Sequence, residues 1–536
     1  MIGSNRSGLM GVGRRFGIVA AALAGLATAG VALGLSQQRT LAGPANGRAA
    51  PASVPPMMLG MNLGGPQYWS SQWTFLDPVQ TTATLLATGA PGWPPAANVV
   101  PMDATGHPVN LPQGTQLAAV LQLGSARLPV GRYDCRVSPG WRVERFGAST
   151  VEGSGPTFRT IVSGSDPKEG WGLLLTAKVK DASLAELSCH PAGADAAGLF
   201  NPAFLDDTRP FGVLRFMEWM RTNSPGLRRW AARATPASFS QGGPEGVAVE
   251  HMVALANRLH ADPWFTLPLD ADPGYHRAFA TYVRDHLDPD RRVYVELSNE
   301  VWNTGFVQAQ LAQQRGHARY PNETPDQAGD YYYADGVREL MATWQAVYGA
   351  HADHLVRVLS SQAVLPPRAD KMLAHKDTWR SVDALATAPY FATDAYGIPG
   401  SGPARVDALF ASAPKVVDEA IGYALGAKAV ARKYGLRYIG YEAGPDFRSG
   451  LADRQPDLLA AARDPRMETL YRRFLTRWKN EVGDLLVVFD SVSTPGGGNN
   501  FGHREYTGQP LSEAPKARAV LDPAFGARTG AGRPAG

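Results

Sequence analysis

The sequence has only two cysteines among 536 residues, and charged residues make up only 19% of it. Lysine and arginine exceed aspartate and glutamate by 52 to 48, and no long basic run lies beyond the N-terminal segment, so the charge balance does not support a nucleic-acid partner. Beyond residue 50 the chain also lacks a Gly-x-Ser-x-Gly elbow and a Walker phosphate-binding loop, which argues against an esterase and a nucleoside triphosphatase.

The N-terminal segment has the pattern of a targeting sequence. Arginines at positions 6, 14 and 15 precede an apolar run over residues 17–35, and a stretch rich in glycine, proline and alanine follows. This pattern predicts a cleaved export signal with its linker over residues 1–50, and hence a periplasmic or secreted protein. The alternative is an uncleaved anchor that keeps the protein at a membrane or cell surface, because the run approaches the ~20 residues that cross a bilayer.

The two cysteines, Cys135 and Cys189, both fall in a region of short β-prone runs. In the oxidising compartment that export implies, a disulfide between them is the simplest expectation. In the chain-entropy model, closing a loop of this size stabilises the fold by about 4 kcal/mol. The alternative is a pair of buried thiols. Two cysteines without C-x-x-C spacing do not suggest a metal site or redox centre, and no cofactor is expected.

The rest of the chain shows two kinds of sequence pattern. Residues 96–200 consist of short β-prone runs broken by glycine, proline, serine and aspartate, which predicts a small inserted β-sandwich. Residues 205–525 alternate apolar runs with amphipathic helical stretches, and residues 56–95 hold one further strand of the same kind. The eight candidate strands are residues 58–63, 211–219, 262–269, 292–298, 353–360, 382–390, 436–442 and 484–490.

Eight nearly continuous apolar strands separated by helices predict a parallel sheet covered by helices. Eight is also the number that closes a (β/α)8 TIM barrel, and we predict this α/β fold with the sandwich inserted between strands one and two. A doubly wound open sheet is the structural alternative.

Two glutamates occupy the ends of predicted barrel strands. Asn299-Glu300 ends the fourth strand and Glu442 ends the seventh, while Arg215 and Tyr390 lie near the ends of the second and sixth. Because chemistry in such barrels collects at the C-terminal strand ends, these side chains are expected at one rim. Two carboxylates about 5–5.5 Å apart suit retaining glycoside hydrolysis. A salt-bridged helix cap for Glu300 and a buried ion pair for Glu442 are the structural alternatives.

The stretches "VYVELSNEVWN" and "YIGYEAG" resemble the clan A retaining glycoside hydrolases, (β/α)8 barrels with Asn-Glu ending strand four and a second Glu ending strand seven. The resemblance implies Glu300 as acid/base and Glu442 as nucleophile. It also implies that Asn299 contacts the 2-hydroxyl of the sugar, and that Arg215 and Tyr390 support the nucleophile. The clan commonly has a tryptophan at the end of strand eight, where this chain offers only phenylalanines at 489 and 501.

Aromatic side chains accompany these strand ends. Trp69 follows the first strand, Trp219 the second, and Trp302 lies two residues after Glu300. We predict that these rings pack against sugar faces, with ordinary core or loop packing as the alternative for each. The sequence thus predicts an exported retaining glycosidase that acts on a poly- or oligosaccharide without a metal. A non-catalytic glycan-binding or scaffold protein and a transglycosylase are the alternatives.

Overall fold

The computed structural model describes residues 54–528, apart from 83–84, 88–99, 125–126, 154, 164–167, 196, 225, 227, 393–397, 448–451 and 494–499. The expected export segment, residues 1–50, lies outside the described residues. Within the described part of the chain, no helix combines the length and the apolar character needed to span a membrane.

Eight parallel strands close into a barrel, and their order around it is the order of the chain. These are β1 (Met58–Asn62), β10 (Val213–Arg215), β11 (Asp262–Leu267), β12 (Val293–Leu297), β13 (Leu355–Ser360), β14 (Ala384–Thr387), β16 (Arg437–Gly440) and β18 (Leu485–Val488). β1 pairs with both β10 and β18, which closes the sheet. The prediction of a TIM barrel is confirmed, and the open-sheet alternative is wrong.

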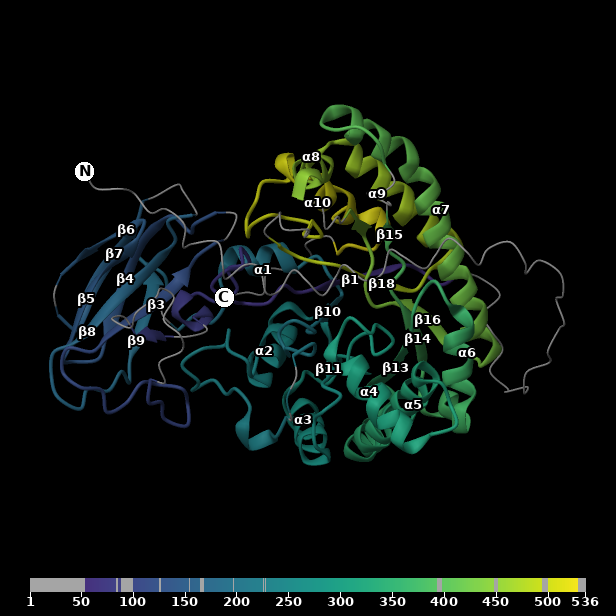
Figure 1. Ribbon diagram of the computed structural model, residues 1–536, viewed down its shortest axis with the longest axis horizontal. Helices are drawn as coiled ribbons and strands as arrows, with labels where there is room; N and C mark the ends of the chain where they lie inside the picture. Colours follow the sequence, from purple (N-terminus) through teal and green to yellow (C-terminus); the bar gives the residue numbers. More distant parts are fainter. Residues whose placement is uncertain are drawn as a thin grey trace.

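Helices cover the outside of the barrel (Figure 1). They are α1 (Pro202–Thr208), α2 (Val249–Leu259), α3 (Pro273–His286), α4 (Val307–Arg319), α5 (Pro325–Tyr348), α6 (Pro366–Ala374), α7 (Pro403–Lys433), α8 (Gln455–Arg463), α9 (Arg466–Arg477) and α10 (Pro515–Val520). α2 buries Met252, Leu255 and Leu259, as its periodicity predicts. α3 begins where the Asp272 carboxylate accepts the backbone N–H of Tyr275, a typical N-cap.

Short elements complete the fold. β15 (Phe391–Ala392) and β17 (Pro445–Asp446) pair with each other beyond the ends of β14 and β16. The 3-10 helices are η1 (Pro78–Thr81), η2 (Trp230–Ala232), η3 (Gly349–His354), η4 (His375–Ser381), η5 (Ala452–Arg454), η7 (Leu511–Glu513) and η8 (Pro523–Phe525), and η6 (Trp478–Val482) is a π-helical turn.

Two antiparallel four-stranded sheets lie between β1 and β10 in the chain, and Figure 1 shows them beside the barrel. One sheet contains β2 (Leu85–Ala87), β3 (Gln116–Gln122), β8 (Trp171–Ala177) and β5 (Trp141–Gly147); the other contains β6 (Ser149–Glu152), β7 (Thr157–Val162), β4 (Gly131–Val137) and β9 (Leu187–Pro191). The sheets share a hydrophobic core separate from that of the barrel, in which the rings of Tyr133 and Trp171 lie 4.6 Å apart. The predicted inserted sandwich is confirmed, and its first strand precedes residue 96.

The disulfide joins neighbouring strands of one sheet. Cys135 on β4 and Cys189 on β9 are direct cross-strand partners, with Cα atoms 4.1 Å apart, and their sulfur atoms are bonded. Both side chains lie in the sandwich core. The predicted disulfide is confirmed, and the alternative of two free thiols is wrong.

Candidate active site

The chain turns sharply where β12 ends, and the turn displays Asn299 and Glu300. Ser298 and Glu300 both have left-handed backbone angles, with φ of 60° and 44°. Such angles are uncommon for residues other than glycine, and they cluster at functional sites. The backbone N–H of Ser298 donates to the carbonyl of Leu267 on β11, so the turn begins while the chain is still held by the sheet.

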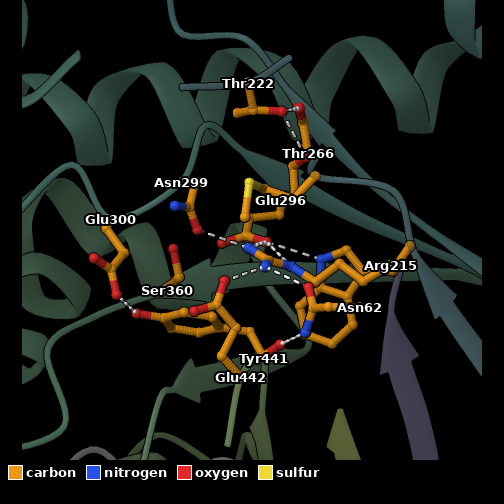
Figure 2. A network of polar contacts seen from close by, with 12 residues as sticks. Asn62, Arg215, Thr222, Thr266, Glu296, Asn299, Glu300, Ser360, Tyr441 and Glu442 are labelled. Atoms are coloured by element: carbon orange, nitrogen blue, oxygen red, sulfur yellow. Dashed lines mark hydrogen bonds and ion pairs between the residues drawn. The ribbon is translucent and has the colours of Figure 1, made fainter. Parts of the chain in front are cut away.

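The guanidinium of Arg215, at the end of β10, lies fully buried at the centre of the site. Its Nε and Nη2 donate to Glu296 Oε2 at 3.1 and 2.9 Å, and Nη2 also donates to Asn299 Oδ1 at 2.9 Å. Its Nη1 donates to Asn62 Oδ1 at 2.9 Å and to Glu442 Oε1 at 2.7 Å. Arg215 therefore joins four strand ends (Figure 2).

Glu442 follows β16 and is 5% exposed. Its Oε1 faces Arg215, and its Oε2 accepts the hydroxyl of Tyr390 at 2.9 Å. Burial raises the pKa of Glu442 to about 8; Arg215 opposes this rise, the charge of Glu300 adds to it, and the Tyr390 hydrogen bond lowers it. Glu442 is thus a carboxyl group whose proton affinity is set by several neighbours at once.

Glu300 is half-buried and receives hydrogen bonds from two neutral donors. The hydroxyl of Tyr441 donates to Oε1 at 3.2 Å, and the amide of Asn303 donates to Oε2 at 2.9 Å. Tyr441 directly precedes Glu442 in the chain. The Tyr441 side chain donates to Glu300, and the Glu442 side chain accepts from Arg215 (Figure 2). The structure therefore places Glu300 and Glu442 at the same rim, within electrostatic reach of each other.

An amide network holds Asn299 in place. Asn299 Nδ2 donates to Asn223 Oδ1 at 3.2 Å, and Gln308 Nε2 donates to the same oxygen at 2.6 Å and to the backbone carbonyl of Asn299 at 2.8 Å. Sequence reasoning missed Asn223 and Gln308, which lie in a loop and a helix without a distinctive pattern. It also missed Tyr441 and Glu296, although a glutamate within the apolar run "VYVEL" was a visible signal of a buried polar partner.

The predicted sugar-binding role of Trp219 is wrong. Its side chain is 0% exposed, its Nε1 donates to the carbonyl of Gly64 at 3.0 Å, and its ring packs against Phe204 and Phe216. Because no face of the indole is open, no ligand can stack on it. Trp219 is a core residue.

The other predicted aromatic residues are accessible. Trp69 is 43% exposed and packs edge-to-face against Tyr68, with ring centroids 4.8 Å apart. Trp302 is half-buried beside Glu300. Both side chains are partly exposed, so they stay candidates for sugar contact.

A cluster of rings occupies the end of β18, where the clan resemblance would place a tryptophan. Phe489 and Phe501 lie 5.3 Å apart, and both contact the ring of Tyr390, at centroid distances of 6.4 and 5.6 Å. The two phenylalanines thus help to position the tyrosine that donates to Glu442. Their side chains are half-buried rather than fully enclosed.

These features define the class: a (β/α)8-barrel protein with an inserted β-sandwich and a cluster of buried charge at the C-terminal rim of the barrel. No protein-family model matches the sequence, and no curated protein matches it. Similar solved structures include a GH51 arabinofuranosidase from Xanthomonas axonopodis pv. citri, at 13% identity over 56% of this chain and 61% of that chain, with a TM-score of 0.37.

Two further similar structures come from bacterial glycosidases. A family 51 alpha-L-arabinofuranosidase from Bifidobacterium longum is 12% identical over 62% of this chain and 68% of that chain, with a TM-score of 0.38. A family 1 β-glucosidase from Thermotoga maritima is 11% identical over 61% of this chain and 86% of that chain, with a TM-score of 0.33. The chain thus spans about 61% of the length of the first of these structures. The functional assignment rests on the geometry of the site.

Proposed function

We propose that this protein is an exported retaining glycoside hydrolase that cleaves a poly- or oligosaccharide, with Glu442 as nucleophile and Glu300 as acid/base. One observation carries the proposal: two glutamates from the ends of β12 and β16 meet at one rim, with Tyr441 bonded to one and Arg215 to the other. Retaining glycosidases need such a pair, one carboxyl to attack and one to transfer a proton.

The surroundings of the two carboxyl groups differ in the way this mechanism requires. Glu442 has a direct contact with the fixed cation of Arg215 and a donor in Tyr390, both of which favour its ionised form. Two donors to Glu300, the Tyr441 hydroxyl and the Asn303 amide, are neutral. The mechanism requires the proton on Glu300 and the negative charge on Glu442, and the contacts of Glu442 with Arg215 and Tyr390 favour that ionised form against the effect of its burial.

The reaction then runs in two displacements. An oxygen of Glu442 attacks the anomeric carbon and forms a glycosyl ester, while the bond to the glycosidic oxygen breaks and its electron pair stays on that oxygen. The leaving oxygen takes the proton of Glu300. Water then gives a proton to the ionised Glu300 and attacks the same carbon, which breaks the ester and restores both glutamates. The configuration of the anomeric carbon is retained.

Asn299 has one donor that no described residue occupies. Its Oδ1 accepts from Arg215, and Nδ2 donates one hydrogen to Asn223, which leaves the second N–H of Nδ2 for a ligand. This N–H is assigned to the 2-hydroxyl of the reacting sugar. Trp69 and Trp302 are partly exposed, and they are assigned to sugar units further along the substrate.

Trapping the covalent intermediate tests the proposal. The full-length protein is incubated with a panel of 2-deoxy-2-fluoro glycosides that carry a dinitrophenyl leaving group, in gluco, galacto, manno, xylo and arabino configurations. We expect a mass increase of one fluoroglycosyl unit on the peptide that contains Glu442, and none in the Glu442→Gln variant. Labelling of another residue would refute Glu442 as the nucleophile, and no labelling by any member of the panel would support the alternative of a non-catalytic glycan-binding protein.

A further inference from the structure

Glu296 is a buried charge in the middle of an apolar strand. It lies on β12, four residues before Glu300, and is 0% exposed. Its Oε2 accepts three N–H groups: Nε and Nη2 of Arg215, and Nε1 of Trp264 at 2.9 Å. Three donors on one oxygen, two of them from a cation, form the environment of an ionised carboxylate. A buried charge is costly unless it is paired, so this contact with Arg215 is strongly held.

The hydrogen bonds of Arg215 show how its charge is divided. A guanidinium has five N–H groups. Two of them bond Glu296, one bonds Glu442, and the other two bond the amide oxygens of Asn62 and Asn299. Every donor is therefore assigned, and Glu296 receives twice as many as Glu442.

A single buried cation thus faces two buried carboxylates. We propose that Glu296 is a positioning residue that holds the guanidinium of Arg215 in place and offsets most of its positive charge. Glu296 thereby sets the pH at which Glu442 becomes a nucleophile. This inference rests on the proposed function of Glu442. A carboxylate that shares its counter-ion is more basic, and a more basic carboxylate is the stronger nucleophile.

Other titratable groups face the same cluster, and the charge of one of them, Glu300, itself raises the pKa of Glu442. They are Glu218, Glu300, Tyr333, Tyr390, Tyr441 and Asp446. Among these, Tyr390 and Tyr441 have pKa values raised well above the ordinary value, first by burial and then by the neighbouring glutamates, so they stay neutral donors at physiological pH. Burial likewise raises the pKa of Glu218, against the charges of Arg221 and Arg215.

The test removes the negative charge of Glu296 and keeps the shape of its side chain. In Glu296→Gln the whole charge of Arg215 becomes available to Glu442, so we expect the titration point of Glu442 to fall by about one pH unit. It is measured by NMR on protein labelled with 13C at the glutamate carboxyl groups, with the Glu442 signal assigned from its loss in Glu442→Gln. The acid limb of kcat/KM should move by the same amount. At one unit below the wild-type limb, activity relative to each enzyme's plateau should rise about five-fold.

A matched control separates charge from packing. Trp264→Phe removes a neutral donor from the same oxygen of Glu296 without changing any charge, so it should leave the titration point within about 0.3 unit. In Glu296→Asp the shorter side chain moves the negative charge away from Arg215. This variant should lower the titration point of Glu442 by less than Glu296→Gln does. Should both variants at position 296 leave the titration of Glu442 unmoved or raise it, the inference is wrong. A shift in the NMR titration without any glycosidase activity would overturn the proposed function alone.

Discussion

Replacing Glu442 by glutamine should change how the stability of the barrel depends on pH. The pKa of Glu442 is raised from 4.5 to about 8 in the folded protein, first by burial. A carboxyl group with a raised folded pKa contributes stability that is complete below its unfolded pKa. That contribution is lost as the pH rises through the folded value. Wild-type protein should therefore become less stable between pH 5 and pH 7.

The size of the effect follows from proton counting. Between these two pH values the unfolded chain has released the proton of this carboxyl group, while the folded site still holds one. Each pH unit then costs a little over 1 kcal/mol, so two units cost about 3 kcal/mol. The result is the same if the shared proton resides on Glu300, because the pair of glutamates binds it as a unit. In Glu442→Gln the repulsion within the pair is gone, and this part of the pH dependence should disappear.

Urea unfolding followed by circular dichroism at 222 nm measures this difference, because among the described residues the α-helices belong to the barrel half. The free energy of unfolding is extrapolated to water at pH 5 and pH 7 for wild type, Glu442→Gln and the control Glu339→Gln, an exposed glutamate on α5. The control should keep the wild-type slope. If Glu442→Gln also loses about 3 kcal/mol between the two pH values, the raised affinity of this site for a proton is refuted.

Four other changes have defined outcomes. Tyr390→Phe removes a donor from the ionised nucleophile, so kcat/KM should fall about ten-fold and its acid limb should move to higher pH in a rate–pH profile. Replacing Cys135 and Cys189 together by serine opens a loop of 54 residues and should lower the stability of the sandwich by about 4 kcal/mol, measured by near-UV dichroism in urea. Trp219→Ala should destabilise the barrel by about 3–5 kcal/mol in the same titration, whereas Trp69→Ala, at an exposed site, should change it by less than about 1 kcal/mol.

The barrel was predictable because its strands are buried on both faces. A parallel strand inside a barrel contacts helices outside and the other strands' side chains inside, so it is apolar along its length and stands out in the sequence. The ends of the strands were less predictable. The run 211–219 reads as one strand, yet β10 stops at Arg215 and the chain turns back into the core. Periodicity reports burial and does not show where the backbone leaves a sheet.

The error on Trp219 has the same origin. A tryptophan just beyond a predicted strand end was expected at the rim, but the shorter strand returns it to the interior beside Phe204 and Phe216. Glu296 shows the opposite case, because it lies inside the strand and yet belongs to the polar site. Its position in the sequence marks it as buried, but only the structure shows that Arg215 lies between it and Glu442. The position of Arg215 between the two glutamates depends on contacts between strands that are distant in sequence.

The sandwich also shapes the mouth of the barrel, which its own sequence does not indicate. The amide of Gln122, at the end of β3, donates to the carbonyls of Tyr68 and Ser70 at 3.0 and 2.7 Å, and the backbone N–H of Leu123 donates to Tyr68 as well. These three bonds hold the loop after β1 on both sides of the exposed Trp69. Since that loop extends from a barrel strand whose last residue, Asn62, bonds Arg215, the sandwich and the charged centre of the site are braced through one short segment. Removing the sandwich would therefore release part of the rim together with the insert.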